Sequence, residues 1–409
     1  MSKVIVIGGG AAGMMASYAA GMCGHEVILL EKNEKLGKKI YITGKGRCNF
    51  TNACEPEDFL KNVVSNDKFL YSSLYTFSPQ QMMDFIEEFG TPIKVERGNR
   101  AFPVSDHASD ITKALKKAMD SVGVEVKLYE EVDHILTKDN VVCGVAMKDQ
   151  TTYPCNHVIL ATGGNSYQTT GSNGAGYEMA RKLQMKVKEV HPALVPMETK
   201  EEDIFSLQGL SLKNVSLKIS DGKRTYFDSF GEMLFTHFGI SGPLVLSASS
   251  YVTDLLGKKD LKAYIDFKPA LSYDKLEQRI LRFVKDHPKN KMISLLKDML
   301  PHKVADVFLQ RLEISGEKNL SDLTKEERTE LIGMLKGFEL SIKKTRGFKE
   351  AIVTKGGISV KEINPSTMEA KNIKGLSVCG EVLDVDALTG GFNLQIAFST
   401  GYLAGISID

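Results

Sequence analysis

The chain has 409 residues, of which 42% are hydrophobic and 25% are charged, with a formal net charge of +1. This length and composition are typical of two or three globular domains and exclude a disordered chain. The near-neutral balance also excludes a strong overall attraction to nucleic acid or anionic membranes. No apolar run approaches the about 20 residues that span a bilayer, and we find no secretory signal, so we expect a soluble, cytoplasmic protein.

The cysteines give no sign of a metal site. They stand at positions 23, 48, 54, 143, 155 and 379, and none forms a C-x-x-C pair. Zinc sites and thioredoxin-like pairs usually need that spacing. We therefore expect reduced thiols and no bound metal.

The N-terminal residues have the pattern of a βαβ unit. The short apolar run at residues 4–7 predicts a buried parallel strand. The Ala- and Met-rich residues 14–22 favour a helix, and residues 27–30 predict a second strand. A glycine-rich turn joins the first strand to the helix, as in dinucleotide-binding domains.

This turn satisfies the G-x-G-x-x-G pattern at Gly8, Gly10 and Gly13. In that pattern the first glycine permits a tight turn, the second lets a pyrophosphate approach, and the third allows close packing of helix on strand. Glu31 ends the second strand at the distance expected for a ribose-binding acid. The alternative is a glycine turn in a βαβ unit that binds nothing.

Residues 32–52 favour FAD over NAD. They are glycine-rich, basic and polar, whereas an NAD domain would proceed quickly to a third strand. A second loop that contacts phosphate and flavin suits the longer FAD molecule. Arg47 could pair with the pyrophosphate in a bidentate manner. The alternative is a solvated basic loop.

Further strands are expected downstream. Residues 124–132 predict one strand, residues 141–145 and 151–153 predict two more, and residues 158–160 predict a buried strand that ends in Ala161-Thr162-Gly163-Gly164. In many flavoproteins such a turn returns the chain to the FAD. In FAD domains the residue at the position of Val132 contacts adenine through its backbone.

The C-terminal residues are expected to complete the same pocket. Residues 375–384 predict a strand that runs into an acidic loop, and the glycines at 390 and 391 open a final helix that extends to about residue 404. The N–H groups at the start of this helix could face the flavin pyrimidine edge. There they would stabilise the negative charge that grows as the flavin is reduced.

Between residues 191 and 346 the pattern changes. Alternating apolar residues at 215–219 and 261–267, with a turn at Asp221-Gly222, predict a small antiparallel sheet or barrel. Residues 273–336 have helical periodicity, with a capping box at residues 324–327. The expected fold class is α/β: a Rossmann-like, glutathione-reductase-like FAD-binding domain with an inserted antiparallel β domain that carries a helical subdomain. The expected boundaries are 1–190 with 347–409, 191–270 with 338–346, and 271–337.

Together these motifs resemble the bacterial flavoproteins of the BaiN/RdsA type, once called uncharacterised NAD(FAD)-utilising dehydrogenases. The resemblance is carried by residues 8–13, 43–52, 234–243 and 380–395 and covers essentially the whole chain. Two departures are visible. Ala387 and Phe392 stand where the family often has Gly and Tyr, and Ala370 replaces a family Ser.

The resemblance implies FAD contacts at Glu31, Arg47, Asn49, Val132, Thr162, Gly163, Gly380, Glu381, Gly391 and Asn393. The motif glycines and their neighbours complete the predicted cofactor site with Gly8, Gly10, Ala12, Gly13, Lys32, Gly37, Gly44, Cys48, Gly164, Asp384, Leu394 and Gln395.

The chemistry expected is that of a flavoenzyme. No second dinucleotide motif is present, since the glycines of residues 171–176 follow a strand already used, so NADH or NADPH would dock only transiently. Three activities stay open: reduction of a carbon–carbon double bond in a small molecule, reduction of a uridine in ribosomal RNA to dihydrouridine, and oxidation of an amine such as aminoacetone. A flavin-bearing RNA-binding factor is the non-catalytic alternative.

Two basic clusters give some support to an RNA substrate. The first comprises Lys38, Lys39, Lys45 and Arg47, and the second comprises Lys343, Lys344, Arg346 and Lys349. Such residues could follow phosphates, although Lys-rich faces are usually just solvated.

Double-bond reduction also needs a proton donor near the flavin. Cys48 in the flavin loop and His237 in the insert are the candidates. The alternatives are ordinary packing for Cys48 and a structural role for His237.

Overall fold

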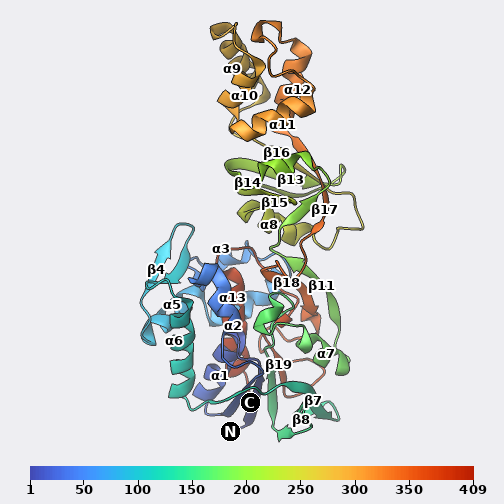
Figure 1. The fold of residues 1–409 in the computed structure, drawn as a ribbon. Helices are drawn as coiled ribbons and strands as arrows, with labels where there is room; N and C mark the ends of the chain where they lie inside the picture. Colours follow the sequence, from blue (N-terminus) through green and yellow to red (C-terminus); the bar gives the residue numbers. More distant parts are fainter. The chain divides into compact units, whose positions relative to one another are not determined.

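The computed structural model describes all 409 residues and divides into two compact units (Figure 1). The first unit comprises Met1–Ala193 and Gly347–Asp409, and the second unit comprises Leu194–Arg346. The first boundary lies three residues beyond the expected position. The reason is that β11 (Val187–Ala193) pairs antiparallel with β18 (Val353–Ile358) and so belongs to the first unit.

A five-stranded parallel sheet forms the centre of the first unit. Four of its strands are apolar and almost completely buried, as is usual in parallel sheets, whereas the edge strand β6 is partly exposed. The first strand of the chain lies in the middle of the sheet, and the last strand of the chain lies at one edge. The order is β19 (Leu376–Val378), β10 (His157–Leu160), β1 (Lys3–Ile7), β2 (Glu26–Glu31) and β6 (Glu125–Leu128).

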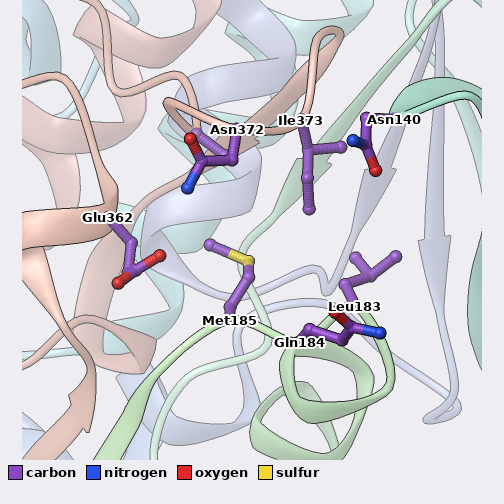
Figure 2. Close-up of a pocket in the computed structure, with 8 residues that line it drawn as sticks. Asn140, Leu183, Gln184, Met185, Glu362, Asn372 and Ile373 are labelled. Atoms are coloured by element: carbon purple, nitrogen blue, oxygen red, sulfur yellow. The ribbon is translucent and has the colours of Figure 1, made fainter.

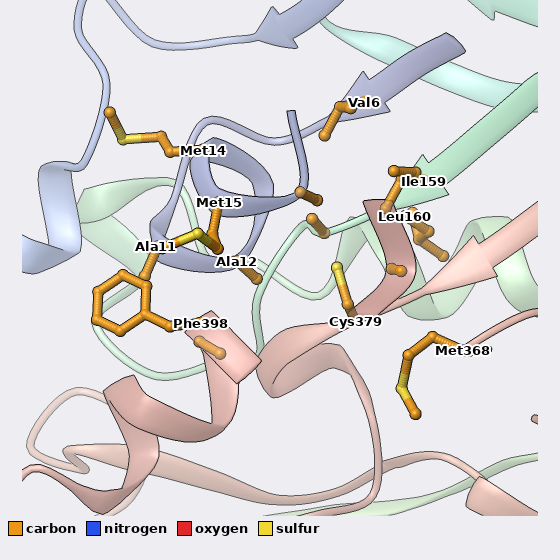
Figure 3. Close-up of a cluster of buried hydrophobic side chains, with 14 of the residues drawn as sticks. Val6, Ala11, Ala12, Met14, Met15, Ile159, Leu160, Met368, Cys379 and Phe398 are labelled. Carbon is orange, nitrogen blue, oxygen red and sulfur yellow. The ribbon is translucent and has the colours of Figure 1, made fainter. Parts of the chain in front are cut away.

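The first and last helices of the chain pack directly on each other. α1 (Ala11–Met22) meets α13 (Phe392–Ile406) so closely that a Cβ on Gly401 would lie 2.4 Å from the Ala12 carbonyl oxygen. A Cβ on Gly405 would lie 2.5 Å from the carbonyl oxygen of Ala16. Figure 3 shows α1 residues beside Phe398 of α13 in the buried core. The two ends of the chain therefore form one core, as the sequence predicted.

Two small antiparallel sheets flank the parallel sheet. One has the order β3-β5-β4 and the other has the order β7-β8-β9. Their strands are β3 (Thr51–Asn52), β4 (Ile93–Glu96), β5 (Arg100–Pro103), β7 (Val132–Lys138), β8 (Val141–Met147) and β9 (Thr152–Pro154). The remaining helices of this unit are α2 (Lys38–Ile42), α3 (Pro56–Leu60), α4 (Tyr71–Thr76), α5 (Pro79–Glu88), α6 (Ala108–Ser121) and α7 (Ala175–Lys182).

Two of the predicted strands differ from the structure. The strand expected over residues 124–132 is interrupted because Tyr129 has a left-handed φ of +61° and Glu130 N bonds to the Glu31 carbonyl. The chain turns there, so β6 and β7 belong to different sheets. The strand expected over residues 375–384 ends at Val378, and Gly380–Val382 form a short 3-10 helix.

The second unit contains a closed antiparallel barrel of order β12-β15-β14-β13-β16-β17. Its strands are β12 (Met197–Thr199), β13 (Ser211–Ser220), β14 (Thr225–Thr236), β15 (Gly239–Ser241), β16 (Lys262–Asp266) and β17 (Phe338–Thr345). The hairpin expected at Asp221-Gly222 joins β13 to β14. The alternating apolar residues face inward and are buried, which confirms the predicted antiparallel β region.

Five helices complete the second unit. They are α8 (Pro243–Val252), α9 (Tyr273–Asp286), α10 (Met292–Met299), α11 (His302–Leu312) and α12 (Lys325–Lys336). The capping box at the start of α12 is present, because Thr324 accepts from Glu327 N while the Glu327 side chain accepts from Thr324 N. No helix of the structure is long and apolar enough to cross a membrane.

Candidate functional site

The three glycines of the first motif have different surroundings. A Cβ on Gly8, where φ is +105°, would lie 2.7 Å from the Ala161 carbonyl oxygen, and a Cβ on Gly13 would lie 1.9 Å from the Gly8 carbonyl oxygen. Both glycines are therefore required by packing within the fold. A Cβ on Gly10 would meet no atom within 4 Å. The open space beside Gly10 is available for a ligand that approaches the backbone closely.

The N-terminus of α1 begins at this open space. Gly10 supplies no side-chain cap, and the first helical hydrogen bond runs from Met14 N to the Gly10 carbonyl at 2.9 Å. The N–H groups of the first helical turn are thus free to bind an anion, and the helix dipole adds partial positive charge. These are the groups that cradle a pyrophosphate in dinucleotide-binding folds.

The Glu31 carboxylate lies beside the glycine turn. It is only 8% exposed at the end of β2 and accepts from Gly9 N at 2.7 Å. It also accepts from the backbone N and the side-chain Nδ2 of Asn33, at 2.8 and 2.6 Å. These bonds hold the carboxylate in one orientation, next to the turn where a ribose would lie.

Among the residues predicted to contact the cofactor, two have a buried side-chain oxygen without a hydrogen-bond partner. These oxygens are Oγ1 of Thr162, which follows the end of β10, and Oδ1 of Asn49 in the loop of residues 43–52. An unsatisfied buried polar group costs about 1–3 kcal/mol, so native proteins seldom tolerate one unless a ligand or water completes it. Both were predicted to contact FAD. The open Gly10 cradle, the uncapped helix and these two oxygens fit a polar, phosphate-bearing dinucleotide such as FAD.

The loop of residues 43–52 has an unusual backbone. Gly44, Lys45, Gly46 and Cys48 have φ values of +56°, +59°, +87° and +59°. A Cβ on Gly44 would lie 3.0 Å from Asn49 N, so the glycine permits a tight fold there. The loop is therefore held in one specific conformation, and strain of this kind is common at ligand sites.

Cys48 is completely buried in this loop. Burial raises the pKa of its thiol to about 12, although a hydrogen bond with Thr43 opposes that shift. A thiol with no exposed surface and so high a pKa is a poor proton donor at neutral pH. The structure therefore does not support Cys48 as the proton donor and favours ordinary packing.

Arg47 binds protein carboxylates rather than an open phosphate site. Its guanidinium pairs with Glu96 and donates from Nε to Asp106 Oδ1 at 2.9 Å. The guanidinium carbon also lies 4.2 Å from the centre of the Phe102 ring. Hydrogen bonds with Arg47 lower the pKa of Glu96, and bonds with Lys94 and then Arg47 lower that of Asp106. The expected pairing with pyrophosphate is not supported, because both carboxylates already occupy the guanidinium.

Glu381 connects segments that are distant in the chain. Its carboxylate accepts from Lys39 Nζ at 2.6 Å, from Thr354 N at 2.9 Å and from Ser166 Oγ at 3.1 Å. It also lies 3.4 Å from Gly164 N. The side chain was predicted as an FAD contact, but the structure shows it holding the loops around the site together.

The N-terminus of α13 offers backbone groups. Gly391 supplies no side-chain cap, and the first helical bond runs from Gln395 N to the Gly391 carbonyl. The Asn393 side chain bonds to Ala387 N and to the carbonyl groups of Ala387 and Leu388, while the Gln395 side chain bonds within the core. The predicted contacts at Asn393 and Leu394 are therefore available through backbone N–H groups, whereas the Gln395 N–H already donates to the Gly391 carbonyl.

The remaining predicted residues have varied surroundings. Asp384 is 4% exposed and pairs with Lys188 Nζ at 2.5 Å and Asn66 Nδ2 at 2.9 Å. Lys32 donates to Asn173 at 2.9 Å, and burial lowers its pKa. Val132 is buried at the start of β7. A Cβ on Gly164 would lie 2.5 Å from Thr354 Oγ1, so this glycine is needed for packing, and Gly37, Gly163 and Gly380 have left-handed φ values.

His237 belongs to the second unit. Its side chain is exposed, and its ring lies 5.0 Å from the ring of Phe238. No group of three or more His, Cys, Asp and Glu side chains is placed to hold a metal ion.

Several residues that support the site were not predicted. Asn33 orients Glu31, Ser166 and Thr354 hold Glu381, and Lys188 pairs with Asp384. Ser166, Thr354 and Lys188 lie outside any motif, so the sequence carried no signal for them. Asn33 and Asn52 lie within the loop predicted to contact FAD, and Asn52 donates to the carbonyl groups of Gly98 and Gly390. Their amide side chains, which can hydrogen-bond to neighbouring loops, were the signal that could have identified them.

A separate cavity in the first unit is not part of this site. Its volume is about 180 Å³, and Figure 2 shows polar and apolar side chains around it. It is lined by Asn140, Leu183, Gln184, Met185, Glu362, Ala370, Asn372 and Ile373. None of these residues belongs to the predicted cofactor site.

Comparison with known proteins gives the family. A family model described as the HI0933-like protein Rossmann domain matches residues 2–407. The chain belongs to this family. This confirms the resemblance inferred from the motifs, and the chain is an FAD-dependent oxidoreductase.

Two curated relatives match nearly the whole chain. The 3-dehydro-bile acid delta(4,6)-reductase of Clostridium scindens is 32% identical over 99% of this chain and 98% of its own length. The ribosomal RNA dihydrouridine synthase of Haemophilus influenzae is 31% identical over 100% of this chain and 98% of its own length.

A solved structure shares the fold. The 3-ketosteroid-delta4-(5alpha)-dehydrogenase of Rhodococcus jostii RHA1 is 16% identical, with a TM-score of 0.54. The match covers 99% of this chain and 96% of that protein.

Proposed function

We propose that this protein reduces a carbon–carbon double bond conjugated to a carbonyl group, with FAD as cofactor and NADH or NADPH as electron donor. The observation that carries the proposal is the open cradle at Gly10, where the N-terminus of α1 has no side-chain cap. The unsatisfied buried oxygens of Thr162 and Asn49 are further polar groups that a bound cofactor would satisfy. Bound FAD in its reduced form supplies the hydride for such a reaction.

The reaction type is supported by what the two relatives' names have in common. One is named as a reductase of a 3-dehydro-bile acid and the other as a dihydrouridine synthase. In both substrates the double bond is conjugated to a carbonyl, so hydride addition builds negative charge on the carbonyl oxygen. A protein that serves this chemistry must place hydride, stabilise that charge and deliver a proton.

The residues of this chain would share the task of holding the cofactor. The first-turn N–H groups of α1 would bind the diphosphate, and Glu31 would accept hydrogen bonds from ribose hydroxyls. The backbone N–H groups at the start of α13 would bind the flavin pyrimidine edge. A nicotinamide donor would dock transiently, since the chain has one dinucleotide motif.

Two substrate classes follow from the relatives: a uridine in ribosomal RNA and a small unsaturated ketone. We favour the RNA because the turn between β4 and β5, which Asn52 links to the loop before α13, carries two exposed arginines without ion pairs, described below. An amine oxidase is the remaining alternative, and no contact in the site favours it.

Of the two candidate proton donors, His237 remains the proposed one, because the thiol of Cys48 is completely buried and cannot contact a substrate. The variant His237→Gln should reduce flavin at the wild-type rate with NADH or NADPH and lose turnover of the double bond. If turnover persisted with a normal pH profile, the proton would come from another group.

The cofactor site is tested by a glycine pair. Gly10→Ala and Gly333→Ala each place a methyl group where no atom lies within 4 Å, so both proteins should fold. Only Gly10→Ala should lose FAD affinity, by about tenfold or more, since the methyl group would occupy the space of the diphosphate. Equal FAD binding by both variants would contradict the proposed site.

The reaction is tested with the reduced holoenzyme in the absence of oxygen. One arm offers ribosomal RNA from a strain that lacks the gene, and nucleoside mass spectrometry measures new dihydrouridine. A second arm offers an uncharged steroid enone. A third arm uses the oxidised holoenzyme in air and measures the hydrogen peroxide that forms when an amine is added. If neither double bond is reduced and peroxide forms when the amine is oxidised, the proposal is overturned in favour of the oxidase.

A further inference from the structure

The hairpin of β4 and β5 ends in a turn that carries two arginines. Residues 97–99 form the turn, and Glu96 of β4 lies opposite Arg100 of β5 in the register of the two strands. Gly98 and Asn99 have left-handed φ values of +78° and +57°. The conformation is that of a tight hairpin loop, so the two arginines flank it in a fixed arrangement.

This turn is attached to the C-terminal part of the proposed flavin site. Asn52 Nδ2 donates to the carbonyl oxygens of both Gly98 and Gly390 at 3.0 Å, and Ala53 N donates to the Asn99 carbonyl at 2.7 Å. β3 lies between the two segments. On one side it pairs with β5, and on the other a Cβ on Gly391 would lie 2.4 Å from the Thr51 carbonyl oxygen. The backbone of Arg100 therefore lies one strand spacing, about 5 Å, from β3, the strand that touches the α13 N-terminus.

The charges near the turn are balanced everywhere except at its tip. Arg47 and Lys94 pair with Glu96 and Asp106, and these four charges cancel. Arg97 and Arg100 are exposed and make no ion pair. The Arg100 Nε donates to the Arg97 carbonyl oxygen at 3.0 Å, which orients its guanidinium. The tip therefore presents two positive charges that no carboxylate of the protein neutralises.

These charges differ from the basic clusters that the sequence suggested. In the first cluster Lys38 pairs with Glu34, Lys39 with Glu381, and Arg47 with two carboxylates. In the second cluster Lys344 and Arg346 share Glu198, while Lys343 and Lys349, like Lys45 of the first cluster, are exposed single lysines without an ion pair. The paired residues have much less charge to offer an incoming anion than the Arg97–Arg100 tip.

We propose that Arg97 and Arg100 bind phosphodiester oxygens of an RNA strand and so position its uridine at the flavin site. This inference rests on the proposed function. Guanidinium groups bind phosphate in a bidentate manner, and exposed arginines on a protruding turn suit a long strand that remains in solvent. A small apolar substrate would be enclosed and would not need them. The arginines set RNA affinity and leave the chemical step unchanged.

The test compares two double variants. Arg97→Ala/Arg100→Ala removes the tip charges, and Lys223→Ala/Arg224→Ala removes the same number of charges from the exposed β13–β14 turn. RNA binding is measured by fluorescence anisotropy on the full chain, with and without FAD, at several salt concentrations. The RNA is a labelled, unmodified ribosomal hairpin that contains a uridine found as dihydrouridine in RNA from the wild-type strain.

The tip variant should weaken RNA binding about 10- to 100-fold and reduce the slope of log affinity against log salt by about 1.4, because two phosphate contacts are lost. KM for RNA should rise while kcat at saturation and turnover of an uncharged enone stay unchanged. The β13–β14 variant should behave as wild type. The conservative Arg97→Lys/Arg100→Lys variant should restore most of the salt slope.

Three results would overturn the inference. The first is that the tip variant and the wild type have the same RNA affinity and the same salt slope. The second is that the β13–β14 variant loses as much RNA affinity as the tip variant. The third is that the wild-type protein reduces the enone but does not bind RNA. The last result leaves the proposed reduction intact. Failure of the wild-type protein to bind FAD would instead contradict the proposed function. RNA binding by the apoprotein would still be measurable in that case, so the two failures can be distinguished.

Discussion

The two units of the molecule differ in what they bury. The first unit buries the carboxylates of Glu31, Asp384 and Asp386, together with several amide and hydroxyl side chains. The second unit buries polar side chains only as hydroxyls, at Thr199, Ser220, Ser249, Ser250 and Thr253. A buried carboxylate is costly unless it is paired or hydrogen-bonded, and Glu31 and Asp384 are held in this way by neighbouring groups. Such clusters of buried charged groups are common at functional sites.

The second unit shows the contrasting case of a core held by apolar packing. Phe308 stacks on Phe338 at 5.4 Å and meets Phe267 edge-on at 5.5 Å. These contacts are complete without any ligand. The comparison therefore teaches that changes in the second core should alter stability alone, whereas changes around the buried carboxylates should alter both stability and cofactor binding.

The largest effect is expected in the second core. Phe308→Ala removes a fully buried ring and should lower the free energy of unfolding of the second unit by about 3–5 kcal/mol. FAD affinity should stay at the wild-type value in the folded protein. Denaturant unfolding followed by circular dichroism, with flavin fluorescence as a separate signal, measures both. A parallel loss of FAD affinity under native conditions would break the distinction between the units.

A pH effect is expected in the first unit. Burial lowers the pKa of His157 to about 4, and its Nε2 lies 2.9 Å from Ser377 Oγ. In the unfolded chain this imidazole becomes protonated near pH 6.5, whereas in the folded chain it stays neutral down to about pH 4. The free energy of unfolding should therefore fall by up to about 3 kcal/mol as the pH drops from about 6.5 towards 4. Unfolding curves at several pH values should show a smaller fall in His157→Gln. Parallel curves for both proteins would assign the effect to other groups.

A smaller effect is expected at the Lys39–Glu381 pair. Its side chains are 22% and 20% exposed, so Glu381→Gln should lower the unfolding free energy of the first unit by about 2 kcal/mol. FAD affinity should also fall, since Glu381 holds the loops of residues 164–166 and 354. The exposed Lys61–Asp58 pair provides the control, and Asp58→Asn should have almost no effect. Equal losses in the two variants would remove the special role of Glu381.

The smallest effect is expected at Cys48. Its raised thiol pKa, about 12, and its complete burial predict slow alkylation at neutral pH, in contrast to the exposed Cys23 and Cys143. Cys48→Ala should keep the wild-type turnover of substrate. Rapid labelling of Cys48 in the native holoenzyme, detected by peptide mass spectrometry, would show that the loop opens and would reinstate the thiol as a proton donor.

The sequence predicted the parts of the site that depend on local patterns. The strand, glycine turn and helix of residues 4–22 were found where expected, since the apolar periodicity and the glycines specify them within one stretch of chain. The prediction of one continuous strand over residues 124–132 was wrong, because a single residue with a left-handed backbone conformation, Tyr129, turns the chain. Tyrosine is not a usual residue at such a position, so no local signal existed.

By itself the sequence determined the βαβ unit, the family and the presence of a flavin-type cofactor, because each rests on short motifs whose residues are close together within the motif, even where the motifs themselves are far apart. Only the tertiary structure decided which charges are free. Arg47 is neutralised by carboxylates 49 and 59 positions away, and Lys39 by one 342 positions away. Ion pairs form through space between residues that no sequence spacing connects, so composition could not tell the paired basic residues from the unpaired arginines at the hairpin tip.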